Sequence, residues 1–162
     1  MRALVAAGAL LGALLWQTAV SRISPGYAWL LDPFLLVVVY FGLTGGELQG
    51  TLVGAAAGWI QDIQFGGPIV GFGGLTKLLV GFAVGLASER FVLVGSAPRL
   101  IAVFGATLLD ALLLERLAAL FQVPIAELSF AGLVARANAN AIAGVLLFEG
   151  VERRRRILAR RR

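Results

Sequence analysis

The sequence predicts an all-α, polytopic membrane protein whose fold is a bundle of six transmembrane helices. Of its 162 residues, 59% are hydrophobic and only 14% are charged, whereas a soluble domain carries about 25% charged residues. Mean hydropathy is +0.90, and apolar residues dominate from residue 3 to residue 148, so no soluble domain can be separated. Short turns divide this stretch into six segments, each close to the ~20 residues that cross a bilayer core.

The composition also excludes several kinds of functional site. The chain contains no Cys and no His, which excludes disulfides, thiolate nucleophiles, His-based proton relays and the usual zinc sites. It has no Gly-x-Ser-x-Gly motif, no acidic pair at an accessible mouth and no clustered carboxylates. We therefore predict no enzyme activity, no cofactor and no metal site.

The first expected helix, residues 3–20, has two interpretations. A signal peptide is one of them, because Arg2 precedes the apolar run and Ala19-Val20-Ser21 resembles a cleavage site. The run is longer than the apolar region of a usual signal peptide, and five more segments follow, which favours a retained helix. The second helix, residues 27–43, contains Asp32-Pro33 near its start, where proline is tolerated and an acidic residue favours the helix dipole.

The third and fourth helices, residues 47–63 and 71–88, carry glycine at every fourth position. In a helix such residues lie above one another on one face, and in lipid small residues let two helix backbones approach closely. These segments are therefore expected to pack tightly against each other around a short turn. The rows consist of Gly46, Gly50, Gly54 and Gly58, which Asp62 continues, and of Gly73, Lys77, Gly81 and Gly85.

The fifth and sixth helices, residues 99–121 and 128–148, complete a transmembrane domain of residues 1–148. Residues 149–162 are expected to form a basic tail, which includes Arg153, Arg154, Arg155 and Arg156. With six crossings both termini share one side, and arginines are concentrated there and in the loop between the fourth and fifth helices. By the positive-inside rule both termini are predicted to be cytoplasmic. The tail is interpreted as a topology signal and a contact for anionic lipid, with a specific docking site as the alternative and no nucleic-acid partner.

Ionisable residues within the apolar segments are expected to face the bundle interior and to pair, because an unpaired charge in lipid costs at least ~2.5–3.5 kcal/mol. We expect Asp62 to pair with Lys77 on the next helix, and Arg136 to reach Asp110. The alternative is a proton or substrate path. Structural pairing is favoured, because the first two segments show almost no polar stripe. Glu115 and Arg116 lie nearer the surface and are expected to snorkel.

Several features of the middle of the chain together resemble the rod shape-determining protein MreD family. They are Asp32-Pro33 at a helix start, the run Gly58-Trp59-Ile60-Gln61-Asp62 that ends a glycine-rich helix, Gly67-Pro68 followed by Gly71, and Gly81, Gly85 and Arg90. The order Asp-Pro is reversed relative to the pair more usual in that family, and no role is assigned to Asp32. Length, segment count and basic ends also agree with the family.

The resemblance implies a non-enzymatic subunit of the bacterial inner membrane that supports peptidoglycan synthesis and cell shape. Its implied partners are the single-pass protein MreC, the MreB filament and a RodA-type synthase complex. The family also resembles, in fold, the membrane substrate-binding subunits of energy-coupling-factor transporters, and a vitamin-binding transporter subunit is the alternative function. From the glycine rows we further expect that part of one row, at Gly50 and Gly54 or at Gly81 and Gly85, is left open for a partner's helix.

Overall fold

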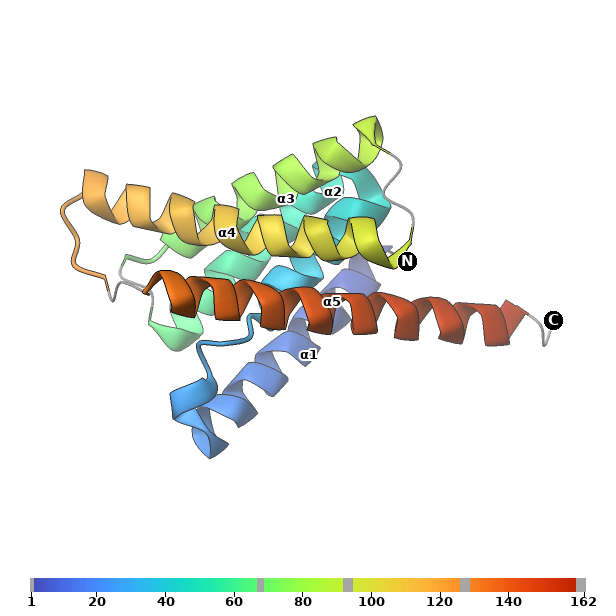
Figure 1. Ribbon diagram of the computed structural model, residues 1–162, viewed down its shortest axis with the longest axis horizontal. Helices are drawn as coiled ribbons and strands as arrows, with labels where there is room; N and C mark the ends of the chain where they lie inside the picture. Colours follow the sequence, from blue (N-terminus) through green and yellow to red (C-terminus); the bar gives the residue numbers. More distant parts are fainter. Residues whose placement is uncertain (1, 67–68, 92–94, 126–128, 160–162) are drawn as a thin grey trace.

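The computed structural model describes residues 2–66, 69–91, 95–125 and 129–159, and helices are the only regular secondary structure in these ranges (Figure 1). The helices are α1 (Arg2–Ile23), the short 3₁₀ helix η1 (Pro25–Tyr27), α2 (Pro33–Phe65), α3 (Phe72–Arg90), α4 (Ser96–Leu120) and α5 (Phe130–Ala159). The prediction of an all-α fold is therefore confirmed. The chain shows five α-helices in these ranges where the sequence predicts six segments.

Four of these helices are long and apolar enough to cross a membrane. They comprise Ala3–Ile23 of α1, all of α2 and α3, and Phe130–Arg154 of α5. The helix α4 is not among them, and it carries the charged residues Arg99, Asp110, Glu115 and Arg116. The composition of the described helices thus supports a membrane protein, as predicted.

The difference in helix number comes from α2, which contains both the second and the third predicted segments. Gly46 interrupts this helix with a positive φ of 78° and a ψ of −172°, a backbone conformation that glycine adopts without steric cost. The two parts fold back on each other. Phe34 and Phe65 lie near opposite ends of α2, yet their rings are 6.4 Å apart. In an unbroken helix of 33 residues the two ends would be about 50 Å apart. Beyond the break, the Glu47 amide donates to the carboxylate of Glu89 on α3 at 3.1 Å.

The second part of α2 and α3 pack with their backbones in direct contact, as the glycine spacing predicts. A Cβ atom added to Gly50, Gly54 or Gly58 would overlap the carbonyl group of Gly81, Lys77 or Gly73 respectively. In the opposite direction, a Cβ on Gly81 would overlap the carbonyl of Gly50, and one on Gly85 would overlap the backbone of Glu47. The two rows therefore fill each other.

This mutual contact contradicts the expectation of a glycine row left open for a partner. Each of the four positions named for that role, Gly50, Gly54, Gly81 and Gly85, already faces backbone of the opposite helix. The physical reason is that the rows have the same four-residue period on antiparallel neighbours, so they match along their whole length.

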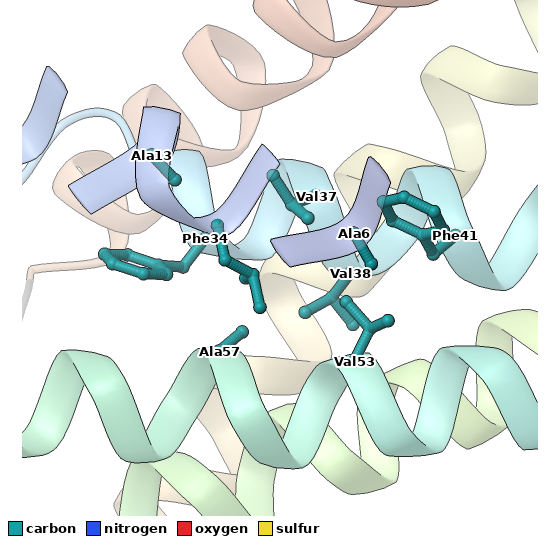
Figure 2. Close-up of a cluster of buried hydrophobic side chains, with 9 residues drawn as sticks. Ala6, Ala13, Phe34, Val37, Val38, Phe41, Val53 and Ala57 are labelled. Carbon is teal, nitrogen blue, oxygen red and sulfur yellow. The ribbon is translucent and has the colours of Figure 1, made fainter. Parts of the chain in front are cut away.

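The remaining helices pack around α2. Its first part lies between the α1 side chains Ala6, Leu10 and Ala13 and its own second part, as Figure 2 shows for Phe34 and Val38 against Ala57 and Val53. On the other side, Leu35 and Val39 meet buried residues of α3, α4 and α5. Among the described elements, α1 packs only against α2 and η1. The helix α1 is consequently the most peripheral part of the bundle, and it runs obliquely to α4 and α5 (Figure 1).

Several predicted segment boundaries shift. The first part of α2 begins at Pro33, because the chain forms η1 and an extended stretch where the helix was expected to start at residue 27. The helix α4 begins at Ser96, slightly earlier than expected, and α5 continues to Ala159, so most of the predicted tail is helical. Gly67, Pro68 and residue 128, as well as the side chains of Arg155 and Arg156, lie outside the described residues.

Candidate functional site

The centre of the polar interior is Asp32, which is only 2% exposed. It is the N-cap of α2: its backbone is extended (φ −109°, ψ 93°) and its Oδ1 accepts a hydrogen bond from the Leu35 amide at 3.0 Å. Proline at the first helical position, Pro33, lacks an amide hydrogen that the helix would leave unpaired anyway. The local sequence Asp-Pro thus starts the helix and places a carboxylate inside the bundle.

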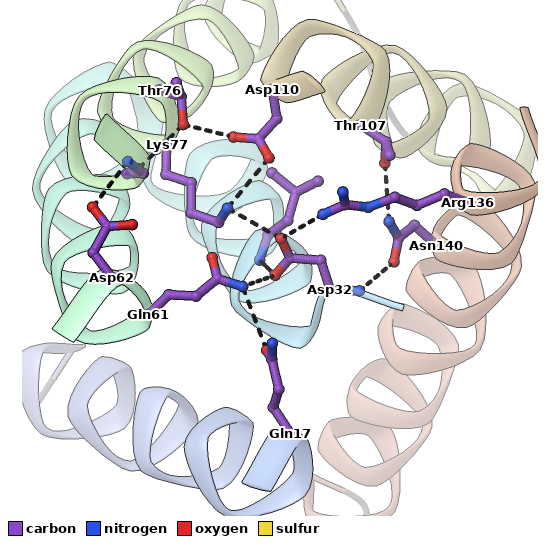
Figure 3. A network of polar contacts seen from close by, with 12 residues as sticks. Gln17, Asp32, Gln61, Asp62, Thr76, Lys77, Thr107, Asp110, Arg136 and Asn140 are labelled. Atoms are coloured by element: carbon purple, nitrogen blue, oxygen red, sulfur yellow. Dashed lines mark hydrogen bonds and ion pairs between the residues drawn. The ribbon is translucent and has the colours of Figure 1, made fainter. Parts of the chain in front are cut away.

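Two cations meet this carboxylate from other helices (Figure 3). Lys77 Nζ of α3 lies 3.1 Å from Asp32 Oδ2 and 3.2 Å from Oδ2 of Asp110 on α4. Arg136 Nη2 of α5 lies 3.2 Å from Asp32 Oδ2. Two carboxylates and two cations therefore balance in charge. We call Asp32, Lys77, Asp110 and Arg136 the charge cluster.

Neutral side chains form further hydrogen bonds around the charge cluster. The fully buried Asn140 accepts from the Asp32 amide at 2.9 Å through Oδ1, and its Nδ2 donates to Thr107 Oγ1 at 3.4 Å. Thr76 Oγ1 donates to Asp110 Oδ1 at 2.9 Å. A charge-balanced network with most partners inside the protein is the arrangement that makes buried charges tolerable in a low-dielectric interior.

Asp62 has a different role from the predicted one. Its Oδ2 accepts from the backbone amides of Gly71 at 2.8 Å, Gly73 at 2.9 Å and Gly74 at 3.3 Å. These amides lie at the N-terminus of α3, where they have no partner within the helix and where the helix dipole favours a negative charge. The expected Asp62–Lys77 pair is therefore wrong. The start of α3 takes the Asp62 carboxylate, and Lys77, further along that helix, points to Asp32 and Asp110.

The expected contact between Arg136 and Asp110 is also replaced, although both side chains belong to the charge cluster. Arg136 binds Asp32, and Asp110 binds Lys77. Glu115 and Arg116 are exposed. Within the described ranges, no group of three or more His, Cys, Asp or Glu side chains could hold a metal ion.

Asp32, the residue that joins the charge cluster, was not among the predicted site residues. From the sequence, Asp32 is expected only at a helix start, although an N-cap at the same end of the bundle as Lys77 and Arg136 is a candidate partner for both. This position could have been inferred from the sequence, because consecutive helices of a bundle alternate in direction. Asn140 carried no comparable signal, because an amide side chain in an apolar helix does not reveal which backbone group it binds.

The second feature is a lateral groove between α1 and α5, whose floor is the first part of α2. Its volume is about 850 Å³. We call it the α1–α5 groove, and its lining is Val5, Ala9, Gly12, Ala13, Trp16, Leu31, Pro33, Leu36, Val37, Tyr40, Phe41, Ala143, Leu146, Leu147, Val151 and Arg154. Among the side chains that the structure describes, Arg154 is the only charged one in this lining. The groove exists because α1 contacts α2 but not α5 within the described chain.

Comparison with protein-family models, curated proteins and solved structures finds no match to this chain. The features of the chain that bear on its function are therefore the charge cluster, the glycine contacts and the exposed surfaces of the bundle.

Proposed function

We propose that this chain is a non-enzymatic scaffold subunit of the bacterial inner membrane that works through helix contacts. By its resemblance to the MreD family, the complex it serves is the rod-shape elongation machinery, with MreC as direct partner and MreB and a RodA-type synthase as further members. In that role it supports peptidoglycan synthesis and cell shape.

The observation that carries this proposal is how the polar groups are used. The four residues of the charge cluster bind one another, and Asp62 binds the start of α3. Such an interior holds helices in fixed positions and leaves little reactive chemistry for a substrate. Short connections join the described helices, so partners have mainly lipid-facing helix surfaces to contact.

In the proposed arrangement the bundle crosses the membrane six times. The fold-back at Gly46 lets α2 supply two crossings, and α1, α3, α4 and α5 supply one each. The charge cluster buries Asp110, the residue that makes the middle of α4 polar, which supports α4 as a crossing helix. With both termini on one side, the arginine-rich end of the chain supports a cytoplasmic location for them by the positive-inside rule.

The second candidate is a vitamin-binding subunit of an energy-coupling-factor type transporter. One observation favours it: Arg136 Nε is buried and has no hydrogen-bond partner among the described residues, so it could donate to a small anionic ligand. The balance of charge within the cluster favours the scaffold, because a further anion would compete with Asp32 for the same guanidinium.

Affinity purification of the full chain from membranes of its native host separates the two functions. The scaffold proposal expects MreC and a RodA-type synthase to co-purify, and expects depletion of the chain to turn rod-shaped cells round. The matched control is an unrelated six-helix membrane protein carrying the same tag. Recovery of an ATPase module together with a bound small molecule, with normal cell shape after depletion, would refute the scaffold.

A further inference from the structure

We propose that the α1–α5 groove is a binding site for one anionic phospholipid, with an acyl chain in the groove and the phosphate at Arg154. This inference goes beyond the scaffold function and does not depend on it. It concerns a lipid of the leaflet that faces the two termini.

The length of the groove fits one leaflet of a bilayer. On α1 its lining extends from Val5 to Trp16 and on α5 from Ala143 to Arg154, which at 1.5 Å per residue is about 16 Å on each helix. This is about half of a hydrocarbon core ~30 Å thick. The groove therefore matches the depth of one leaflet. A partner's transmembrane helix would instead need a surface that continues across both leaflets.

One end of the groove lies on the side of the bundle that carries the two termini. The direction of the chain places Val5 of α1, Phe41 of α2 and Val151 of α5 at one end, and Trp16 and Pro33 at the other. The first end is the one toward which both termini lie (Figure 1). The groove thus runs from the membrane surface on the side of the termini toward the bilayer centre, as an acyl chain does.

A positive charge lies at one end of the groove. Arg154 is exposed and lies at the surface end of the groove, whereas the other lining side chains that the structure describes are uncharged. A guanidinium forms charge-assisted, bidentate hydrogen bonds with phosphate oxygens. Apolar walls with a single cation at the headgroup level fit a phospholipid with net negative charge, such as phosphatidylglycerol, better than a zwitterionic lipid.

Two pairs of variants test the site, and each pair has a control that differs only in position. Arg154→Gln removes the cation, and Arg153→Gln removes its exposed neighbour, which does not line the groove. Gly12→Leu places a side chain in the groove, and Gly105→Leu adds the same side chain to α4, away from the lining. A Cβ at either glycine would meet open space, so both leucine variants are expected to fold.

The measurement is native mass spectrometry of the purified full chain titrated with phosphatidylglycerol or phosphatidylcholine. We expect one phosphatidylglycerol to be retained preferentially by the wild-type chain. Arg154→Gln should weaken its retention about fivefold, which corresponds to the attraction of one arginine to an anionic headgroup. Gly12→Leu should abolish it, while Arg153→Gln and Gly105→Leu should retain the lipid as the wild type does.

Equal retention of the two lipids, or equal effects of Arg154→Gln and Arg153→Gln, would overturn the proposal. A photo-crosslinking amino acid at Leu146, on the α5 wall of the groove, gives an independent result in native membranes. An adduct with the mass of a phospholipid is expected there. A protein-sized adduct would show that a partner's helix occupies the groove, and the lipid site would then be wrong.

Discussion

Asp32 connects the start of α2 to two other helices, α3 and α5. It caps α2 at Leu35, binds Lys77 and Arg136, and its amide is held by Asn140. Removal of one member of a buried pair costs about 3–5 kcal/mol, because the other charge remains without compensation. The free energy of unfolding should therefore fall more when one charge of the cluster is removed than when a lysine and its aspartate are both replaced by apolar residues.

Substitutions at Lys77 and Asp110 test this expectation. Lys77→Met leaves Asp110 without its cation and should lower the free energy of unfolding by about 3–5 kcal/mol. The double variant Lys77→Met/Asp110→Leu retains the balanced Asp32–Arg136 pair and should recover at least half of that loss. Unfolding of each variant in detergent, followed by circular dichroism, provides the comparison.

Glu115→Gln is the control for these variants, since Glu115 is exposed and a surface substitution is expected to change stability by less than ~0.5 kcal/mol. A double variant that is less stable than Lys77→Met would show that the lysine and the aspartate act independently. In that case charge balance would not be what organises the interior.

At the level of single residues, the sequence was informative about which groups are buried and much less about which of them bind each other. The cost of a charge in lipid correctly placed Lys77, Asp110 and Arg136 in the interior. Their partners depend on the rotation of each helix about its axis and on where α2 starts. Those quantities follow from packing of the whole bundle, so two plausible pairs, Asp62–Lys77 and Arg136–Asp110, were wrong.

At the level of helices, the contact between the second part of α2 and α3 is the closest in the bundle. Gly54→Leu should separate these helices, because even a Cβ at this position would overlap the Lys77 carbonyl group. We expect a loss of several kcal/mol, at the upper end of the ~1–3 kcal/mol typical of overpacking or beyond it, since rigid backbone is displaced. The yield of folded protein in detergent and its unfolding midpoint measure the effect.

Gly105→Leu on α4 is the matched control, because a Cβ there would meet nothing within 4 Å. It should leave stability unchanged or raise it by up to ~1 kcal/mol, since leucine favours a helix more than glycine does. Similar destabilisation by the two substitutions would mean that glycine acts through helix propensity and that the close α2–α3 contact is not important for folding.

The helices themselves were largely predictable, and their ends were not. The four-residue glycine period identified the α2–α3 contact, since a repeat of this kind depends only on local helix geometry. The break at Gly46 was expected as a turn between separate helices, and a single glycine in a positive-φ conformation makes it. The α1–α5 groove could not be predicted, because it arises from the absence of contact between two helices distant in the sequence.

For the whole molecule, the proposed six crossings make a prediction that an unbroken α2 does not. The chain has no native cysteine, so single cysteines can report which side of the membrane each position reaches. Suitable positions are Gly26, within η1, Thr44, next to the break in α2, and Gly150, near the end of α5, all of which are exposed. A membrane-impermeant maleimide should label Gly26→Cys in intact cells, and Thr44→Cys and Gly150→Cys only after permeabilisation. The reason is that each part of α2 must cross the membrane once to place Gly46 on the side of the termini. If α2 crossed only once, Thr44→Cys would lie within the bilayer and remain unlabelled in both conditions, and labelling of Gly150→Cys in intact cells would place the C-terminus outside.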